Sequence, residues 1–254
     1  MQKHKVVSRE EWLAARKAHL IHEKELTRWN DKLAAERREL PWVKVDKDYV
    51  FDGAKGQQGL EQLFGGNSQL IVYHFMFGPD WEQGCPSCSF HADHIDGANL
   101  HLKHHDVTVI AISRASWSKI APFKKRMGWH FDWVSSHGSD FNFDYHVSFT
   151  EADRTGGRAY YNFETRDYMS NELPGISVFF KDADGTIYHT YSAYARGGDI
   201  LLGAVNYLDL TPKGRNETAG TDWVRYHDRY ETTDSHDACC DAKADLPQAV
   251  VSGS

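Results

Sequence analysis

The sequence has few cysteines, no long apolar run and no excess of positive charge. Its 254 residues include only four cysteines, too few for the disulfide framework of a small secreted protein. No apolar run approaches the about 18 residues that a membrane-spanning helix needs. Acidic residues outnumber basic ones by 36 to 29, which gives a net charge of −7. We therefore expect no membrane partner and no nucleic-acid partner.

The start of the chain and its composition set two further expectations. Charged residues follow Met1 without the apolar stretch of a signal peptide, so we expect a cytoplasmic protein. Apolar residues make up 41% of the sequence, which is enough to fill a sizeable core. Ser8 and Glu11 have the spacing of a capping box, and apolar residues then recur at helical intervals to about Leu40.

Composition divides the chain into three parts. We expect a helical extension over residues 1–41 and one α/β domain over residues 42–230. Residues 231–254 have no periodicity and are rich in small and polar residues, so we expect a flexible tail. No linker splits the central part.

The most informative motif is Cys85-Pro86-Ser87-Cys88. An apolar run precedes it, and residues 69–77 are predicted to form a buried strand. Helical periodicity follows, and predicts one helix over residues 86–104. A strand that leads into a CxxC motif at the first turn of a helix is typical of thioredoxin-like redox proteins.

The position of the motif gives each of its residues a role. The start of a helix presents unpaired N–H groups and the positive end of the helix dipole, which stabilise a thiolate. We therefore predict Cys85 as the nucleophile. Cys88, one turn later, is the resolving cysteine that closes the disulfide. Pro86 falls where a helix tolerates a missing N–H group.

The remaining pattern completes a mixed α/β fold. We predict a thioredoxin-like (peroxiredoxin-like) three-layer α/β/α sandwich with a mixed central sheet and an N-terminal helical extension. Residues 128–172 are aromatic and irregular, so only short elements are expected there. The other predicted strands are 42–45, 49–51, 107–112, 176–180 and 186–191, and the other predicted helices are 59–64, 116–127, 199–209 and 221–230.

Four more residues are candidates for supporting the site. Pro174 precedes a predicted strand, and we expect a cis peptide bond there that presents backbone to a substrate. Trp81 could shape the mouth of the site or equally belong to the core. His91 lies on the same helix face as Cys88 and could tune the thiols. Asp93 is near the helix start, where it could move a proton, although a solvated surface carboxylate is the favoured explanation.

The histidines near the CxxC motif allow a second interpretation of the site. His74 precedes the motif, and five more histidines follow it on the predicted helix: His91, His94, His101, His104 and His105. Together with Cys85 and Cys88 they could bind zinc or copper, which makes a metal-binding protein the alternative function. A solvated helix face explains most of them, so no metal is assigned. Cys239 and Cys240 with His236 could exchange electrons with the CxxC motif or belong to an incidental tail.

The motif also carries a resemblance to a known family. Residues 75–96, with Gly78-Pro79-Asp80 and Gly84 to Phe90, resemble the bacterial thioredoxin-like domain-of-unknown-function 899 family. The similarity extends to about Tyr230 and includes Ser113-Arg114-Ala115. It implies a thioredoxin-like fold with Cys85 and Cys88 at the redox position, and it brings no substrate with it. Family members often have an aromatic residue where this chain has His91.

Residues 59–77 are also similar to peroxiredoxins, which makes a peroxidase a further alternative. In peroxiredoxins a threonine stands three residues before the reactive cysteine. Glu82 occupies that place here, so we rank peroxide reduction below disulfide exchange.

The prediction is therefore a thiol–disulfide oxidoreductase that uses Cys85 and Cys88 without a cofactor. Its expected partner is a protein or small-molecule disulfide. The amphipathic N-terminal helix makes a homodimer a further expectation. A non-catalytic interaction module is the remaining alternative, and it requires both thiols to be unreactive in the native protein.

Overall fold

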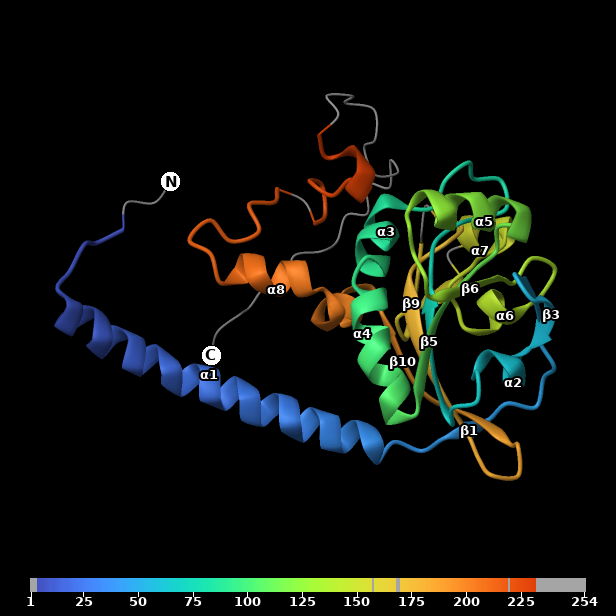
Figure 1. Ribbon diagram of the computed structural model, residues 1–254, viewed down its shortest axis with the longest axis horizontal. Helices are drawn as coiled ribbons and strands as arrows, with labels where there is room; N and C mark the ends of the chain where they lie inside the picture. The colour runs from blue at the N-terminus through green and yellow to red at the C-terminus, as the bar shows by residue number, and fades with distance from the viewer. Residues whose placement is uncertain (1–3, 157, 168–169, 219, 232–254) are drawn as a thin grey trace. The chain divides into compact units, whose positions relative to one another are not determined.

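The chain divides into two compact units, Met1–Val43 and Lys44–Ser254. The structure is a computed structural model that describes residues 4–156, 158–167, 170–218 and 220–231 (Figure 1). The predicted flexible tail, residues 231–254, lies outside the described residues except for residue 231. None of the described helices is long and apolar enough to cross a membrane.

The first unit contains one long helix, α1 (Arg9–Arg38). Ser8 caps it: the Ser8 hydroxyl accepts the Glu11 N–H at 3.2 Å, and the Glu11 carboxylate accepts the Ser8 N–H at 3.0 Å. This is the capping box that the sequence predicts. No described side chain of α1 is buried, and apolar residues such as Leu26 are exposed.

The second unit holds the sheet and the remaining helices. Its strands, with the short β1 at its start, are β1 (Val43–Lys44), β2 (Val50–Gly53), β3 (Gly56–Gly59), β4 (Gln69–His74), β5 (Val107–Ser113), β6 (Asp132–Ser135), β7 (Ala159–Tyr161), β8 (Glu164–Arg166), β9 (Gly175–Lys181) and β10 (Ile187–Tyr194). Its helices are α2 (Leu60–Leu63), α3 (Pro86–Ala92), α4 (Ile95–Leu102), η1 (Lys103–His105), α5 (Trp117–Arg126), α6 (Phe141–Asp144), α7 (Glu151–Thr155), η2 (Ala195–Leu201), α8 (Gly203–Asp209) and η3 (His227–Arg229).

The main sheet has the strand order β1-β10-β9-β4-β5-β6-β2-β3. β4, β5 and β6 are parallel, whereas β9 is antiparallel to β4 and β10 is antiparallel to β9. A parallel βαβ unit that carries CxxC on its crossover helix, followed by an antiparallel hairpin on the other side of β4, is the thioredoxin arrangement. The predicted mixed sheet of a thioredoxin-like, peroxiredoxin-like fold is confirmed.

Side chains of the central strands alternate between two buried clusters. Tyr73 of β4 and Ala111 of β5 face one cluster, together with residues of α3, α4 and α5. Val72 and Ile110 face the other, which includes residues of α2 and α6. Figure 1 shows α3 and α4 on one side of the sheet and α2 and α6 on the other. The period of two along each strand therefore builds the three layers.

The predicted strands 42–45 and 49–51 correspond to β1, which lies beside β10, and to β2, which pairs with β3 and β6. Two other sequence-based expectations about elements are wrong. The predicted helix over 86–104 is interrupted between α3 and α4. Residues 221–230 contain only the short η3. The described part of residues 128–172, by contrast, contains short elements, as predicted.

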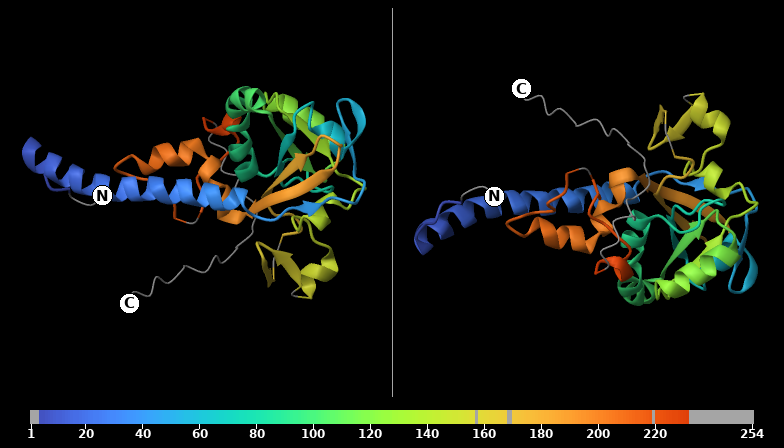
Figure 2. Two further views of the ribbon diagram at one scale, coloured as in Figure 1. Left: turned by 90° about the horizontal axis from the view of Figure 1, so that it is seen from below. Right: turned by 90° about the horizontal axis from the view of Figure 1, so that it is seen from above.

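That segment, residues 128–172, supplies β6 to the main sheet. It also supplies α7 and the separate two-stranded β7–β8 sheet. Figure 2 shows α7, β7 and β8, in yellow, projecting from the main sheet in both views. Aromatic residues without a clear period conceal these elements, because β6 and β7 are too short for an alternation to be recognised.

Candidate functional site

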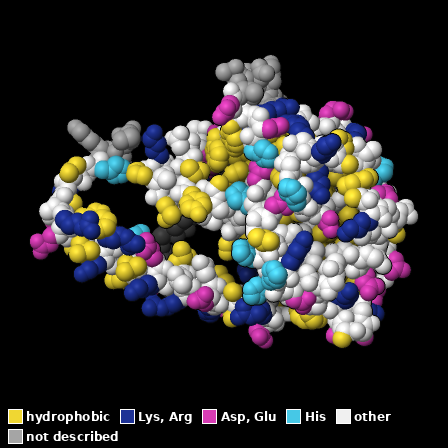
Figure 3. Space-filling model, viewed as in Figure 1, with side chains coloured by type: hydrophobic (Ala, Val, Ile, Leu, Met, Phe, Trp, Pro, Cys, Tyr) yellow, Lys and Arg dark blue, Asp and Glu magenta, His cyan; other side chains and the backbone are white. Residues whose placement is uncertain are grey.

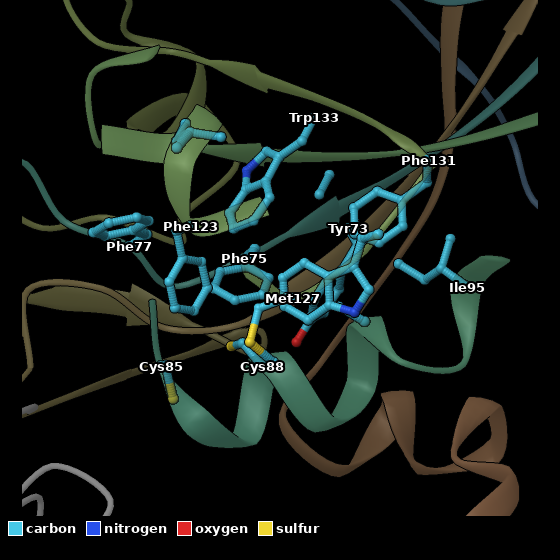
Figure 4. Packing of buried hydrophobic residues seen from close by; sticks show 14 of the residues in the cluster. Tyr73, Phe75, Phe77, Cys85, Cys88, Ile95, Phe123, Met127, Phe131 and Trp133 are labelled. Carbon is cyan, nitrogen blue, oxygen red and sulfur yellow. The ribbon is translucent and has the colours of Figure 1, made fainter. Parts of the chain in front are cut away.

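The two cysteines lie at the start of α3, where β4 ends. Cys85 is the N-cap residue and Cys88 lies one turn further on (Figure 4). Both are buried thiols, with exposed fractions of 4% and 2%. The Cys85 N–H donates to the Met76 carbonyl at 3.0 Å, and the Ser89 hydroxyl donates to the Cys85 carbonyl at 3.0 Å. These bonds fix the start of the helix against the end of the strand.

Gly84 and Pro86, next to Cys85, each suit the backbone at their position. Gly84 lies against aromatic rings: a Cβ atom there would be 2.5 Å from Phe75 Cε1 and 2.9 Å from Phe123 Cε1. Only glycine lets the chain approach these rings so closely. Pro86 occupies the first turn of α3, as predicted, where its missing N–H group has no helical partner to lose.

Hydrogen-bond donors converge on the Cys88 sulfur. The Met76 N–H donates to Cys88 Sγ at 3.5 Å, and the Tyr73 hydroxyl bonds to the same side chain. Burial, followed by the interactions with Cys88, raises the pKa of Tyr73 well above its ordinary value. Tyr73 therefore keeps its proton and serves as a donor.

His91 packs against Tyr73, one turn after Cys88. The two rings stack with centroids 4.2 Å apart and an angle of 22° between their planes. Burial, with a smaller contribution from His94, lowers the pKa of His91 to about 4. The imidazole is therefore neutral at neutral pH. It fixes the ring whose hydroxyl contacts Cys88, and it brings no positive charge to the thiol.

A pocket of about 170 Å³ brings three of the predicted residues together. Cys88, His91 and Pro174 all line it, whereas Cys85 is not among its lining residues. The expected cis bond at Pro174 is wrong, because the described residues contain no cis peptide bond. Pro174 is held in place instead by its carbonyl oxygen, which accepts the Tyr161 hydroxyl at 2.7 Å.

The other two predicted support residues have structural partners away from the pocket. Trp81 is half-buried against the core, and its carbonyl accepts Lys119 Nζ at 3.1 Å. Asp93 Oδ1 accepts Trp129 Nε1 and bonds His227 Nδ1, both at 2.7 Å. Neither residue lines the pocket beside Cys88. Asp93 thus ties the end of α3 to two distant segments.

A C-terminal segment covers the motif, and the predicted site does not include it. The Tyr226 hydroxyl donates to the Gly84 carbonyl at 2.6 Å, and the Ser87 and Thr221 hydroxyls are 2.8 Å apart. Residues 221–230 therefore contact the first turn of α3 and the residue before Cys85. The segment has no periodicity that connects it to the motif, so only its resemblance to the family drew attention to it.

The described histidines do not form a metal site. His101, His104 and His105 are exposed near the end of α4, where Figure 3 shows histidine side chains gathered on the surface. His74 points to the opposite face of the sheet, where its Nε2 lies 2.8 Å from Ser177 Oγ. Among the described residues no three His, Cys, Asp or Glu side chains are grouped so that they could hold a metal ion. Cys239 and Cys240 lie outside the described residues.

A buried carboxylate is a further feature that sequence reasoning missed. Glu172 accepts Arg114 NH1 at 2.9 Å and the Ser148 hydroxyl at 2.6 Å. Burial raises the pKa of Glu172 to about 7, although the two hydrogen-bond partners act in the other direction. The sequence around Pro174 predicts a strand, but it does not indicate that Glu172, two residues before Pro174, is buried.

Fold and motif define a thioredoxin-like protein with a CxxC pair at the end of the central strand β4. Residues 1–230 match the model of a family described as bacterial protein of unknown function (DUF899). The chain belongs to this family, as the sequence resemblance implies. No curated protein matches the chain.

Similar solved structures include redox proteins. Peroxidoxin BcpB from Mycobacterium tuberculosis is 12% identical, with a TM-score of 0.44, and the match covers 66% of this chain and 97% of that one. A putative thiol:disulfide interchange protein DsbE from Chlorobium tepidum is 14% identical, with a TM-score of 0.37 and coverages of 66% and 97%. Scores this low carry no argument about chemistry, so the fold assignment rests on the strand order.

Proposed function

We propose that this protein is a thiol–disulfide oxidoreductase that uses Cys85 and Cys88 as a redox-active pair. The observation that supports this proposal is the placement of two thiols one helical turn apart at the end of β4, with a pocket beside one of them. In the exchange, one thiolate attacks a substrate disulfide and forms a mixed disulfide. The second thiolate then attacks the first cysteine and releases the reduced substrate.

The chemistry needs no cofactor, because the electrons come from the cysteines themselves. The dithiol loses two electrons and two protons, and the substrate disulfide gains them as two thiols. An external dithiol returns the protein to its reduced form by the reverse exchange. The sequence predicts that Cys85 attacks and Cys88 resolves, and the net reaction is the same in either order.

Thiol-linked reduction of disulfides tests the proposal. The experiment uses a Cys239→Ser, Cys240→Ser background, so that tail thiols cannot contribute. Reduction of insulin and of low-molecular-weight disulfides by dithiothreitol is then measured with and without the protein. We expect acceleration in this background with at least one of these substrates, and its loss in both Cys85→Ser and Cys88→Ser. Equal rates for the background and the two variants would contradict the proposal.

The alternatives make different predictions in the same variants. A peroxidase would consume hydrogen peroxide faster than it exchanges disulfides, and would lose that activity with one cysteine. A metal-binding protein would carry stoichiometric zinc or copper after anaerobic purification, and would lose it in Cys85→Ser and Cys88→Ser. An interaction module would keep both thiols unreactive towards alkylation while the protein is folded.

A further inference from the structure

The pocket beside Cys88 has mainly apolar walls. They come from the end of β4, from α3, from the facing ends of β9 and β10, from η2 and the residue after it, and from Thr221 of the C-terminal segment. The apolar lining residues are Met76, Phe90, Pro174, Ile176, Ala193, Ala195 and Leu202. Cys88 is therefore the cysteine on the wall of an apolar pocket, and Cys85 does not line it.

The pocket carries little charge. His91, which also lines it, is neutral because burial lowers its pKa to about 4. Asp199 is the one acidic lining residue, and its carboxylate accepts Arg196 Nε at 2.9 Å. No lysine or arginine is present among the described lining residues. The pocket thus offers nothing to pair with an anionic group on a ligand.

The volume of the pocket limits the size of its ligand. A cavity of about 150 Å³ lined by leucine, isoleucine and phenylalanine binds benzene. The pocket here, at about 170 Å³, therefore holds a group of about six to eight non-hydrogen atoms. The backbone of a polypeptide would lose hydrogen bonds to water inside such an apolar space, so the pocket suits a single arm of a disulfide.

We infer that Cys88 is the thiol that meets the substrate, and that the substrate is a small uncharged disulfide with an apolar arm of the size of this pocket. The inference deepens the proposed function and rests on it. It reverses the order that the sequence predicts. The sequence-based order rests on the start of a helix predicted over residues 86–104, whereas α3 ends at Ala92. The pocket beside Cys88, which Cys85 does not line, supplies a local reason for the other order.

In each step of the exchange, one sulfur–sulfur bond forms and one breaks. The Cys88 thiolate attacks one sulfur of the substrate, a bond forms between the two sulfurs, and the substrate S–S bond breaks. The outer arm leaves as a thiolate and takes up a proton, while the inner arm stays in the pocket. Cys85 then attacks Cys88 Sγ, which forms the protein disulfide and releases the second thiol. An external dithiol reduces the protein disulfide again.

Single-turnover trapping with defined disulfides tests the inference. Cys85→Ser and Cys88→Ser are compared in the Cys239→Ser, Cys240→Ser background, with diethyl disulfide and oxidised glutathione as the probes. Each rate is divided by the rate of the same probe with a free small thiol. We expect Cys85→Ser to form an ethylthio adduct, seen by intact mass, at least about tenfold faster than Cys88→Ser. Diethyl disulfide should exceed oxidised glutathione by a similar factor.

Other outcomes separate the two claims. A faster adduct in Cys88→Ser, or equal normalised rates for the two probes, would overturn the inference and leave the redox pair intact. If neither variant forms an adduct and the cysteine pair supports no turnover, the proposed function fails as well.

A pocket-filling variant provides a second readout that keeps both cysteines. Ala193→Leu places a larger side chain in the pocket, and Ala121→Leu on α5 is the control, because Ala121 is half-buried and does not line the pocket. We expect Ala193→Leu to slow diethyl disulfide by about tenfold, and Ala121→Leu to leave the rate unchanged. Circular dichroism establishes that both are folded. Equal rates in the two variants would contradict the pocket as the binding site.

Discussion

The two faces of the sheet use buried polar rings differently. Tyr73 and His74 are neighbours on β4 and point to opposite faces. The Tyr73 hydroxyl bonds Cys88 beside a pocket. His74 instead joins a hydrogen-bond chain with Ser177 and Ser192, with distances of 2.8 and 2.9 Å. One strand thus contacts the cysteine pair on one face and a structural polar network on the other.

The largest expected effect comes from overpacking the face of the sheet that carries the two cysteines. Gly84→Ala would place its Cβ within 2.5 Å of a Phe75 ring atom, so we expect a loss of about 1–3 kcal/mol in the free energy of unfolding. Urea unfolding measures the loss. Gly97→Ala is the control, since nothing lies within 4 Å of its added Cβ. We expect the control to gain up to about 1 kcal/mol from helix propensity, and similar losses in both variants would refute the packing account.

The pH dependence of stability also compares the two faces of the sheet, because each face buries a neutral histidine. Burial lowers the pKa of His74 to about 3 and that of His91 to about 4, from an ordinary value of 6.5. The unfolded chain binds more protons in this range, so stability is full above pH 6.5 and falls as the pH drops towards these values. Urea unfolding across this range should show a weaker pH dependence in His74→Phe and in His91→Phe. An unchanged dependence in both would contradict their buried neutral state.

Glu172 gives a pH effect of opposite sign. Its pKa rises from 4.5 to about 7 in the folded protein because it is buried, so the folded state binds more protons between these values. Its contribution to stability is therefore full below pH 4.5 and is lost as the pH rises through 7. We expect Glu172→Gln to remove this part of the pH dependence, as measured by denaturant midpoints at several pH values. A steeper fall in the variant would contradict the assignment.

Paired substitutions on β4 test the division of roles directly. Tyr73→Phe removes a hydrogen bond to Cys88, so in a Cys85→Ser background we expect alkylation of Cys88 to slow by about fivefold at neutral pH. His74→Phe acts on the opposite face and should leave that rate unchanged. Alkylation by iodoacetamide, followed by mass spectrometry, measures both. Equal slowing by the two variants would show that the faces are not independent.

The smallest expected effect concerns the C-terminal cover. Tyr226→Phe removes the hydroxyl that donates to the Gly84 carbonyl at 2.6 Å, which should cost about 0.5–1.5 kcal/mol. In a Cys88→Ser background, we also expect faster alkylation of Cys85, because residues 221–230 are held less firmly over it. If stability and alkylation are both unchanged, this contact does not hold the cover in place.

The fold could be predicted from the sequence because the patterns that indicate it lie in short stretches of the chain. The apolar runs of β4 and β5, the CxxC motif between them and the turn between β9 and β10 each follow from a short stretch of sequence. These elements alone define the parallel unit and the hairpin of the thioredoxin arrangement. The capping box of α1 is local in the same sense.

What short stretches of sequence do not reveal depends on contacts between distant residues. Asp93 bonds Trp129 and His227, which no spacing connects to it. The Gly84 carbonyl, just before Cys85, accepts the hydroxyl of Tyr226, more than a hundred residues later in the chain. The orientation of Cys88 towards a pocket likewise depends on η2 and β10. Side-chain roles at this site are therefore set by tertiary packing.

The most direct test of the account is a redox titration of the Cys239→Ser, Cys240→Ser protein in dithiothreitol buffers, followed by intact mass after rapid alkylation. We predict one two-electron transition, in which Cys85 and Cys88 change together from two alkylated thiols to one disulfide. A protein that keeps both thiols reduced under every oxidising condition, while it remains folded, would contradict the central claim.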